Sequence, residues 1–227
     1  MRFWMRVLSA IIWSAGFYGG LLFIPAGSMH WWRAWVATAL TVIAGILSML
    51  ALRGHEDLLR ERFKSPIQTG QPLADKVVIL VLIFSYTFSI LFIGIDRFHL
   101  HLLPAVPDWL SAAGLVLFLM GWAIEAAAMR QNTFAAPVVR HQAERQQHVV
   151  DSGLYAIARH PMYAGAIPLF LGLPLWLQSY AGAAATLVPL ASMVIRIHIE
   201  ERLLKQALPG YEAYMHKVRY RLIPGIW

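Results

Sequence analysis

The sequence has 227 residues, of which 59% are hydrophobic and only 14% are charged, whereas about 25% of the residues in soluble domains are charged. A soluble chain of this length cannot bury so much apolar surface, so the composition indicates a membrane protein. The formal net charge of +7 does not indicate nucleic-acid binding, because the basic residues lie between long apolar segments. The sequence contains no cysteine, which excludes disulfides, thiolate metal ligands and a cysteine nucleophile.

Six apolar segments approach the length that a helix needs to cross a hydrocarbon core of about 30 Å. The first follows Arg2 and Arg6, as in a signal peptide, but it is longer than the usual apolar core of about 7–15 residues and is predicted to be a span. Whether the first two segments cross fully stays open. The last two are separated by only a few residues and are expected to form a hairpin. In chain order the segments are Val7–Ala26, Trp32–Leu52, Val77–Ile95, Leu110–Met129, Met162–Tyr180 and Gly182–Ile199.

The distribution of Lys and Arg predicts the orientation of these segments. If both termini are cytoplasmic, all of the 19 basic residues except Arg33 and Arg97 fall on the cytoplasmic side, as the positive-inside rule requires. We therefore expect an all-α, polytopic bundle of about six spans. Residues 1–75 would form a membrane hairpin with an interfacial helix, and residues 76–227 would form a core with a cytoplasmic pocket.

Two links on the predicted cytoplasmic side carry distinctive residues. The first, Arg53–Lys76, contains HEDLLRERFK, where Leu58, Leu59 and Phe63 have helical spacing among charges. This pattern predicts an amphipathic interfacial helix. The second link, Arg130–Pro161, is expected to act together with the C-terminal segment that follows the last span.

The most informative motif is GLYAIARHPMYAG, followed about thirty residues later by RIHIEERLL. Pro161 suits the first turn of a helix, so Arg159 and His160 are predicted at the mouth of the fifth span. Arg196 and Glu200 are four residues apart and share one helical face. Because the last two spans form a hairpin, His160 and Glu200 should meet at one edge of the membrane.

Each of these features also has a structural interpretation. Arg159 and His160 are suitable interfacial anchors, and Arg196 with Glu200 is a suitable ion pair at a helix end. Glu125 is an intramembrane carboxylate of the kind that marks transport paths, but its place near the cytoplasmic end of the fourth span favours a cavity lining or a helix contact. His99 and His101 have metal-like spacing without evident partners, and an interfacial position is favoured.

The ordered set of motifs carries a family resemblance. It consists of VVDSGLY (Val149–Tyr155), RHPMYAG (Arg159–Gly165), the pair Glu200 and Glu201, and the tail LPGYEAYMHKVRYRLIPGIW (Leu208–Trp227). From about Asn132 onward the chain resembles the isoprenylcysteine carboxyl methyltransferase family and its wider relatives, the membrane phospholipid methyltransferases. The form of the tail is typical of bacterial members, which predicts a bacterial inner-membrane location.

The resemblance implies a membrane methyltransferase core that binds S-adenosylmethionine at the cytoplasmic face and takes a lipophilic small molecule or lipid from the bilayer. It makes Arg196 and Glu200 candidate catalytic residues and implies no metal. Oligomeric state is not indicated. The candidate cofactor contacts are Gln142, Tyr155, Arg159, His160, Tyr163, Glu200 and Glu201.

Alternatives remain for both the acceptor and the function. A carboxylate acceptor is already nucleophilic, and Arg196 would orient it, whereas a thiol or amine would need Glu200 to take its proton. A nicotinamide-dependent membrane reductase is a second function, although the sequence has no Gly-rich dinucleotide motif. A transporter or scaffold is a third, but its polar residues should occur at mid-bilayer depth in several spans.

Overall fold

The computed structural model describes residues 2–227, without the side chains of Arg2, Phe3 and Arg6. The predicted N-terminal pair, Arg2 and Arg6, therefore lies outside the described side chains. The described residues form helices and loops without strands, which confirms the all-α class. The α-helices are α1 (Arg2–Ala26), α2 (Trp32–Ala51), α3 (Glu56–Arg62), α4 (Leu73–Ile95), α5 (Asp108–Gln131), α6 (Pro161–Trp176), α7 (Tyr180–Ala185), α8 (Leu187–Ala207) and α9 (Tyr211–Lys217), and the short turns are η1 (Asp96–Leu100), η2 (Ala143–Arg145) and η3 (Gly153–Ala156).

Five segments of the described chain are long and apolar enough to cross a membrane: Val7–Ala26, Trp32–Ala51, Leu73–Leu100, Asp108–Gln131 and Tyr180–Ala207. The fifth expected span, Met162–Tyr180, instead forms α6, which has 16 residues and a length of about 24 Å. Two features end it early. Gln178 has a left-handed φ of 63°, and the side chain of Ser179 caps α7 by accepting a hydrogen bond from the Gly182 amide.

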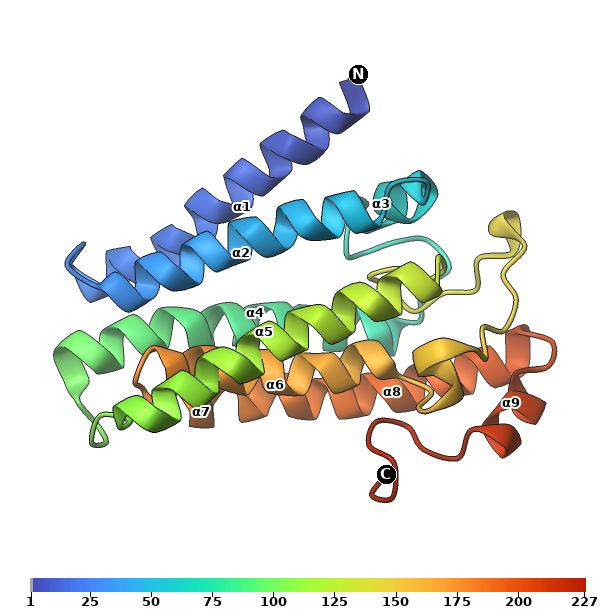
Figure 1. Cartoon of the computed structure of the whole chain (residues 1–227). Helices are drawn as coiled ribbons and strands as arrows, with labels where there is room; N and C mark the ends of the chain where they lie inside the picture. The colour runs from blue at the N-terminus through green and yellow to red at the C-terminus, as the bar shows by residue number, and fades with distance from the viewer. Residues whose placement is uncertain (1) are drawn as a thin grey trace.

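The links between helices lie at the two ends of the bundle (Figure 1). The short turns α1–α2 and α6–α7 lie at one end together with the α4–α5 link, whereas α3, the long α5–α6 link and α9 lie at the other end. The N-terminal end of α1 points toward the end with the long links, whereas the C-terminal tail runs back from α9 below α8.

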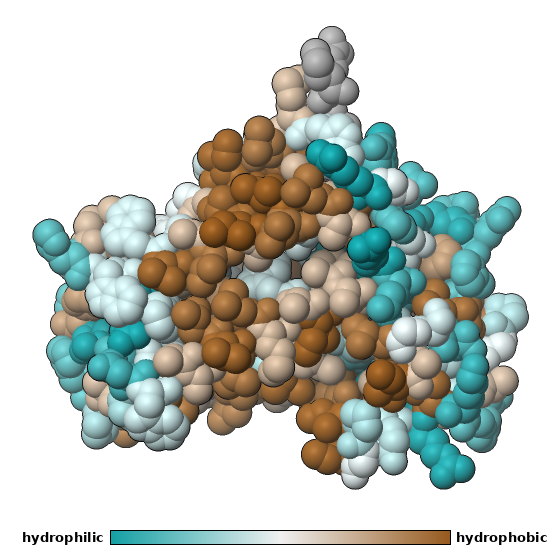
Figure 2. All heavy atoms as spheres, viewed as in Figure 1, coloured by the Kyte–Doolittle hydropathy of each residue, from teal (hydrophilic) through white to brown (hydrophobic). Residues whose placement is uncertain are grey.

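The surface has the distribution of polarity that a bilayer requires. Figure 2 shows hydrophobic residues across the middle of one face, with hydrophilic residues gathered at both ends. Exposed apolar side chains of the long apolar segments include Trp13, Phe84 and Val116, which are 77%, 70% and 64% exposed. Such exposure is costly in water but favourable in lipid.

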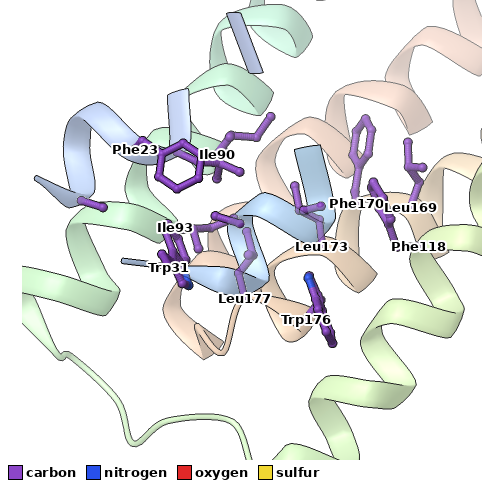
Figure 3. Packing of buried hydrophobic residues seen from close by; sticks show 14 of the residues in the cluster. Phe23, Trp31, Ile90, Ile93, Phe118, Leu169, Phe170, Leu173, Trp176 and Leu177 are labelled. Atoms are coloured by element: carbon purple, nitrogen blue, oxygen red, sulfur yellow. The ribbon is translucent and has the colours of Figure 1, made fainter. Parts of the chain in front are cut away.

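The core lies where α1, α4, α5 and α6 meet (Figure 3). Phe118, Leu173 and Ile93 are almost completely buried there. Helix α1 packs against α2 and α4, α4 packs against α8, and α6 packs mainly against α5. The expected hairpin between the last two segments therefore has a short turn, but the main packing partner of α6 is α5.

Helix α3 confirms the predicted short helix in the first long link. Its leucines, Leu58 and Leu59, are buried against Met129 of α5 and Met162 of α6, whereas Phe63 is 55% exposed. The apolar face of α3 thus packs on the protein, whereas Asp57, Arg60 and the following Phe63 are exposed.

The close contact between α5 and α6 depends on glycine. A Cβ atom on Gly121 would lie 2.6 Å from both the Gly165 carbonyl oxygen and the Leu169 amide nitrogen. We expect Gly121→Ala to destabilise the protein by about 1–3 kcal/mol, because the two backbones must separate. Thermal unfolding of the detergent-purified protein measures the effect.

Gly16→Ala is the matched control, because nothing lies within 4 Å of a Cβ atom at that helical position. Equal unfolding temperatures for Gly121→Ala and Gly16→Ala would show that α5 and α6 do not need this close approach.

Candidate active site

A cavity of about 300 Å³ lies at the end of the bundle that carries the long links. The α5–α6 link and α9 form its polar part, and Ile79, Leu82, Ala166, Phe170 and Met193 form an apolar part between the helices. Of the predicted site residues, those that line it are Gln142, Tyr155, Arg159, His160, Tyr163, Arg196 and Glu200. Glu201 is the exception.

His160 and Glu200 meet at this cavity, although they are forty residues apart in sequence. His160 directly precedes Pro161, the first residue of α6, and its Nδ1 atom lies 4.0 Å from Glu200 Oε2. The Tyr163 hydroxyl donates a hydrogen bond of 2.9 Å to the same oxygen. The helix entrance and α8 therefore present an imidazole, a phenol and a carboxylate to one space.

Glu201 lies behind the cavity wall and binds the residues that form it. Its Oε1 atom accepts a 2.8 Å hydrogen bond from Arg159 Nε and lies 3.3 Å from His160 Nε2. Its Oε2 atom accepts a 2.9 Å hydrogen bond from Arg221 Nε. With only 4% of its surface exposed, this carboxylate orients Arg159 and His160.

The C-terminal tail completes the surroundings of Arg159. The Arg159 Nη1 atom donates to the Val218 and Arg219 carbonyl oxygens at 2.7 and 2.8 Å. The backbone amides of Arg159 and His160 donate to the Tyr220 and Arg221 carbonyl oxygens, both at 2.9 Å. The tail is thus a structural part of the site.

Gln142 and Tyr155 come from the α5–α6 link. Gln142 is 1% exposed, and its amide is engaged within the link, donating to the Phe134 carbonyl at 2.7 Å and accepting from Arg145 at 2.6 Å. The Tyr155 ring is buried beside the cavity, and burial raises the pKa of its phenol, which stays neutral at physiological pH. The Tyr214 hydroxyl donates to the Tyr155 carbonyl at 2.7 Å.

Arg196 is paired with Asp75 of α4. The Arg196 Nε atom donates to Asp75 Oδ1 at 2.8 Å, and Nη2 donates to the Pro137 carbonyl at 2.6 Å. Asp75 is fully buried and also accepts from Gln71 at 2.6 Å and from the Val139 amide at 2.9 Å. Among the described side chains, Glu200 makes no ion pair with Arg196 within 4.0 Å, so the predicted pairing of those two residues is replaced by a cross-helix pair with Asp75.

Charged residues also fasten α3 to the α5–α6 link. Glu61 binds Lys64, which follows α3 in the chain, and Arg140 of the α5–α6 link. The distance between Arg140 Nη2 and Glu61 Oε2 is 3.1 Å. Burial raises the pKa of Glu61, but the hydrogen bonds from Lys64 and Arg140 outweigh this effect and hold it below its ordinary value. Arg140 also binds Glu144 at 2.6 Å.

Sequence reasoning assigned no role in the site to Asp75, Arg221 or Arg62. Asp75 had one available signal, because it is a charged residue at the start of an apolar run. Arg62 lies in the charged segment HEDLLRERFK, which predicted a helix but no site residue. Arg221 lies in the tail that carried the family resemblance, but its contact with Glu201 depends on the fold of the tail. At the opposite end of the bundle, the His99 ring lies 2.9 Å from the Pro25 carbonyl, and no group of three His, Asp or Glu residues in the described part of the chain is arranged to hold a metal.

These features define a class: a polytopic helical membrane protein with a polar cavity that continues into the apolar interior. Residues 109–209 match the family model described as phospholipid methyltransferase. This segment is therefore similar to the phospholipid methyltransferase family, which includes the isoprenylcysteine carboxyl methyltransferases. Members of that family transfer methyl groups to lipid-like membrane substrates.

The matched segment begins with α5 and ends before α9, so it contains the RHP motif and both glutamates. The tail Leu208–Trp227, whose sequence also resembled the family, lies almost wholly beyond it. No curated protein matches the chain significantly.

Proposed function

We propose that the protein transfers a methyl group from S-adenosylmethionine to a lipophilic acceptor at the cytoplasmic face of a membrane. The observation that carries this proposal is the continuity of the cavity. Its polar part, bounded by His160 and Glu200, joins an apolar part between α4, α5, α6 and α8. A polar donor and an apolar acceptor can therefore meet inside one cavity.

The side chains around the polar part suit this methyl donor. When bound, S-adenosylmethionine supplies an electrophilic methyl group on a positively charged sulfur. The Glu200 carboxylate offers an opposite charge, and the rings of Tyr163, Tyr211 and Tyr214 line the same cavity, where aromatic faces favour a cation. We assign donor contacts to Gln142, Tyr155, Arg159, His160, Tyr163 and Glu200.

The other two predicted site residues, Glu201 and Arg196, are assigned different roles. We assign Glu201 a positioning role, because it orients Arg159 and His160 without lining the cavity. We assign Arg196 to the junction between the two parts, where Asp75 holds its guanidinium in place. Holding the reacting groups at attack distance contributes about 7–11 kcal/mol in favourable cases.

The family match favours methyl transfer over a nicotinamide-dependent reduction or transport. We place the cavity on the cytoplasmic side because the end of the bundle that carries it also carries most basic residues. A bacterial inner membrane is the location that this proposal assumes.

Calorimetric binding of S-adenosylhomocysteine to detergent-purified protein tests the proposal. We expect the wild-type protein to bind, and we expect Glu200→Gln and His160→Ala to weaken binding at least about ten-fold, because each removes a polar contact to the ligand. Glu212→Gln is the matched control, since Glu212 is exposed on α9 and its one ion pair among the described residues is with Lys205.

Thermal unfolding of each variant establishes that the protein is folded. Folded wild-type protein that does not bind S-adenosylhomocysteine would overturn the proposed function. Equal affinity in all variants would overturn the assignment of Glu200 and His160 to the donor.

A further inference from the structure

Two charged residues, Arg196 and Glu125, lie where the polar and apolar parts of the cavity meet. They differ in whether the protein supplies them with hydrogen-bond partners. Arg196 is engaged by Asp75 and the Pro137 carbonyl. Glu125 of α5 also lines the cavity, but it makes no hydrogen bond or ion pair with any described residue. A carboxylate inside a helical bundle is costly without a partner, so this one marks a functional position.

Packing of α5 fixes the direction of Glu125. The residue lies one turn after Gly121, whose backbone touches α6 at Gly165, and residues four apart share one helical face. The tight α5–α6 contact therefore directs the carboxylate toward the cavity beside α6. Its position, about 9 Å before the end of α5 at Gln131, places it deeper than His160, which lies at the entrance of α6.

Helix α3 brings Arg62 to the same place. Leu58 and Leu59 are buried against α5 and α6, and Arg62 follows them by four and three residues on the same face. One guanidinium nitrogen donates to the Ala135 carbonyl at 3.1 Å, and the side chain lines the cavity. Burial lowers the pKa of Arg62, and the charge of Glu125 partly offsets this effect.

We propose that Glu125, which lines the cavity together with Arg62, is the carboxylate that binds the acceptor. It would select a nucleophile that carries a proton, and it would accept that proton. The acceptor would be an amine or thiol on an apolar chain. The chain would lie in the apolar part of the cavity, between Ile79, Leu82, Phe170 and Met193. This inference rests on the proposed methyl transfer and extends it to the acceptor.

The step balances with the groups named. The N–H or S–H bond of the acceptor breaks and its proton passes to the Glu125 carboxylate. The electron pair left on nitrogen or sulfur forms the new bond to the methyl carbon. The bond between that carbon and the sulfur of the donor breaks, and its electron pair stays on that sulfur as a neutral thioether. A carboxylate acceptor has no proton to give and would be repelled by Glu125.

A matched set of probes tests this inference: octylamine, octanethiol and octanoate, which share one chain length. Wild-type, Glu125→Gln and Glu212→Gln proteins in lipid nanodiscs are saturated with S-adenosylhomocysteine, and the shift in unfolding temperature on adding octylamine or octanoate reports binding. Transfer of labelled methyl groups from S-adenosylmethionine to all three probes is the second measurement.

We expect octylamine to stabilise the wild-type protein more than octanoate, and Glu125→Gln to weaken octylamine binding about ten-fold. Methylation of octylamine and octanethiol should fall about 100-fold in Glu125→Gln, the size of a lost general base, with S-adenosylhomocysteine affinity unchanged. Glu212→Gln should behave as wild type.

Different results would contradict the role of Glu125 and the proposed function. Preferred binding or methylation of octanoate, unchanged behaviour of Glu125→Gln, or no response to any probe by protein that binds S-adenosylhomocysteine would overturn the role of Glu125 and leave the proposed function standing. An equal loss for all probes in Glu125→Gln would show that the residue only supports the fold. Failure of the wild-type protein to bind S-adenosylhomocysteine would instead overturn the proposed function.

Discussion

Replacing Glu201 by Gln is expected to destabilise the protein by about 3–5 kcal/mol, the usual effect of removing one member of a buried ion pair. Glu201 is 4% exposed and binds both Arg159 and Arg221. The neutral amide leaves two guanidinium groups without their carboxylate. We also expect S-adenosylhomocysteine affinity to fall, because Arg159 and His160 lose their common anchor. Thermal unfolding and calorimetry measure the two effects.

The adjacent residue, Glu200, allows the effects on stability and on ligand binding to be compared. Glu200→Gln should weaken S-adenosylhomocysteine binding with little loss of stability, because Glu200 faces the cavity and makes one hydrogen bond, to Tyr163. The exposed Glu212→Gln should alter neither quantity. If Glu201→Gln proved as stable as Glu212→Gln, the carboxylate would not be the anchor of the motif and the tail.

Most of the fold could be predicted from the sequence, because a bilayer restricts it so strongly. Apolar length and the requirement to satisfy backbone groups predict helices. The five long apolar segments of the described chain overlap five of the expected ones, although Leu73–Leu100 and Tyr180–Ala207 are longer than expected. The length of α6 could not be predicted, since it depends on the backbone conformation of Gln178 and on the cap formed by Ser179. Apolar composition carries no signal for that early end.

The meeting of His160 and Glu200 also followed from sequence, because a helix start and a helix end on the same side of the membrane must lie at one edge. The partners of these residues did not follow. Helical spacing suggested that Arg196 pairs with Glu200, but α8 packs against α4, and this contact supplies Asp75 from a position 121 residues away. Pairing between helices depends on which helices touch, and a single sequence does not reveal this.

The difference between Glu200 and Glu201 shows what structure adds to a motif. The two residues are adjacent and therefore point about 100° apart around α8, given 3.6 residues per turn. One side chain faces the cavity, and the other faces Arg159, His160 and the tail. The two glutamates of the motif therefore meet separate requirements. Glu200 is available to the ligand, whereas Glu201 holds in place the residues that form the cavity wall.

Neutralising Asp75 as Asn is expected to cost about 3–5 kcal/mol of stability, because Arg196 then lies buried without its counterion. Asp75 is fully buried and joins α4, α8 and the α5–α6 link through Arg196 and the Val139 amide. Its loss should also loosen the link that carries Gln142 and so weaken S-adenosylhomocysteine binding. Arg196→Gln should cause a similar loss of stability, since it leaves the Asp75 carboxylate unpaired. Thermal unfolding and calorimetry of the two variants measure these losses.

The combined variant Asp75→Asn with Arg196→Gln separates the structural role of this pair from a role in catalysis. It contains no unpaired buried charge at the two positions, and an amide–amide hydrogen bond remains available, so we expect its stability loss to be smaller than the sum of the single losses by about 0.5–3 kcal/mol. Strictly additive losses would show that the two residues do not act as a pair. If the double variant regains stability and S-adenosylhomocysteine binding but transfers no methyl group, then the guanidinium of Arg196 acts on the acceptor as well as on the fold. If transfer returns together with stability, the pair serves only to fasten α4, α8 and the link around the cavity.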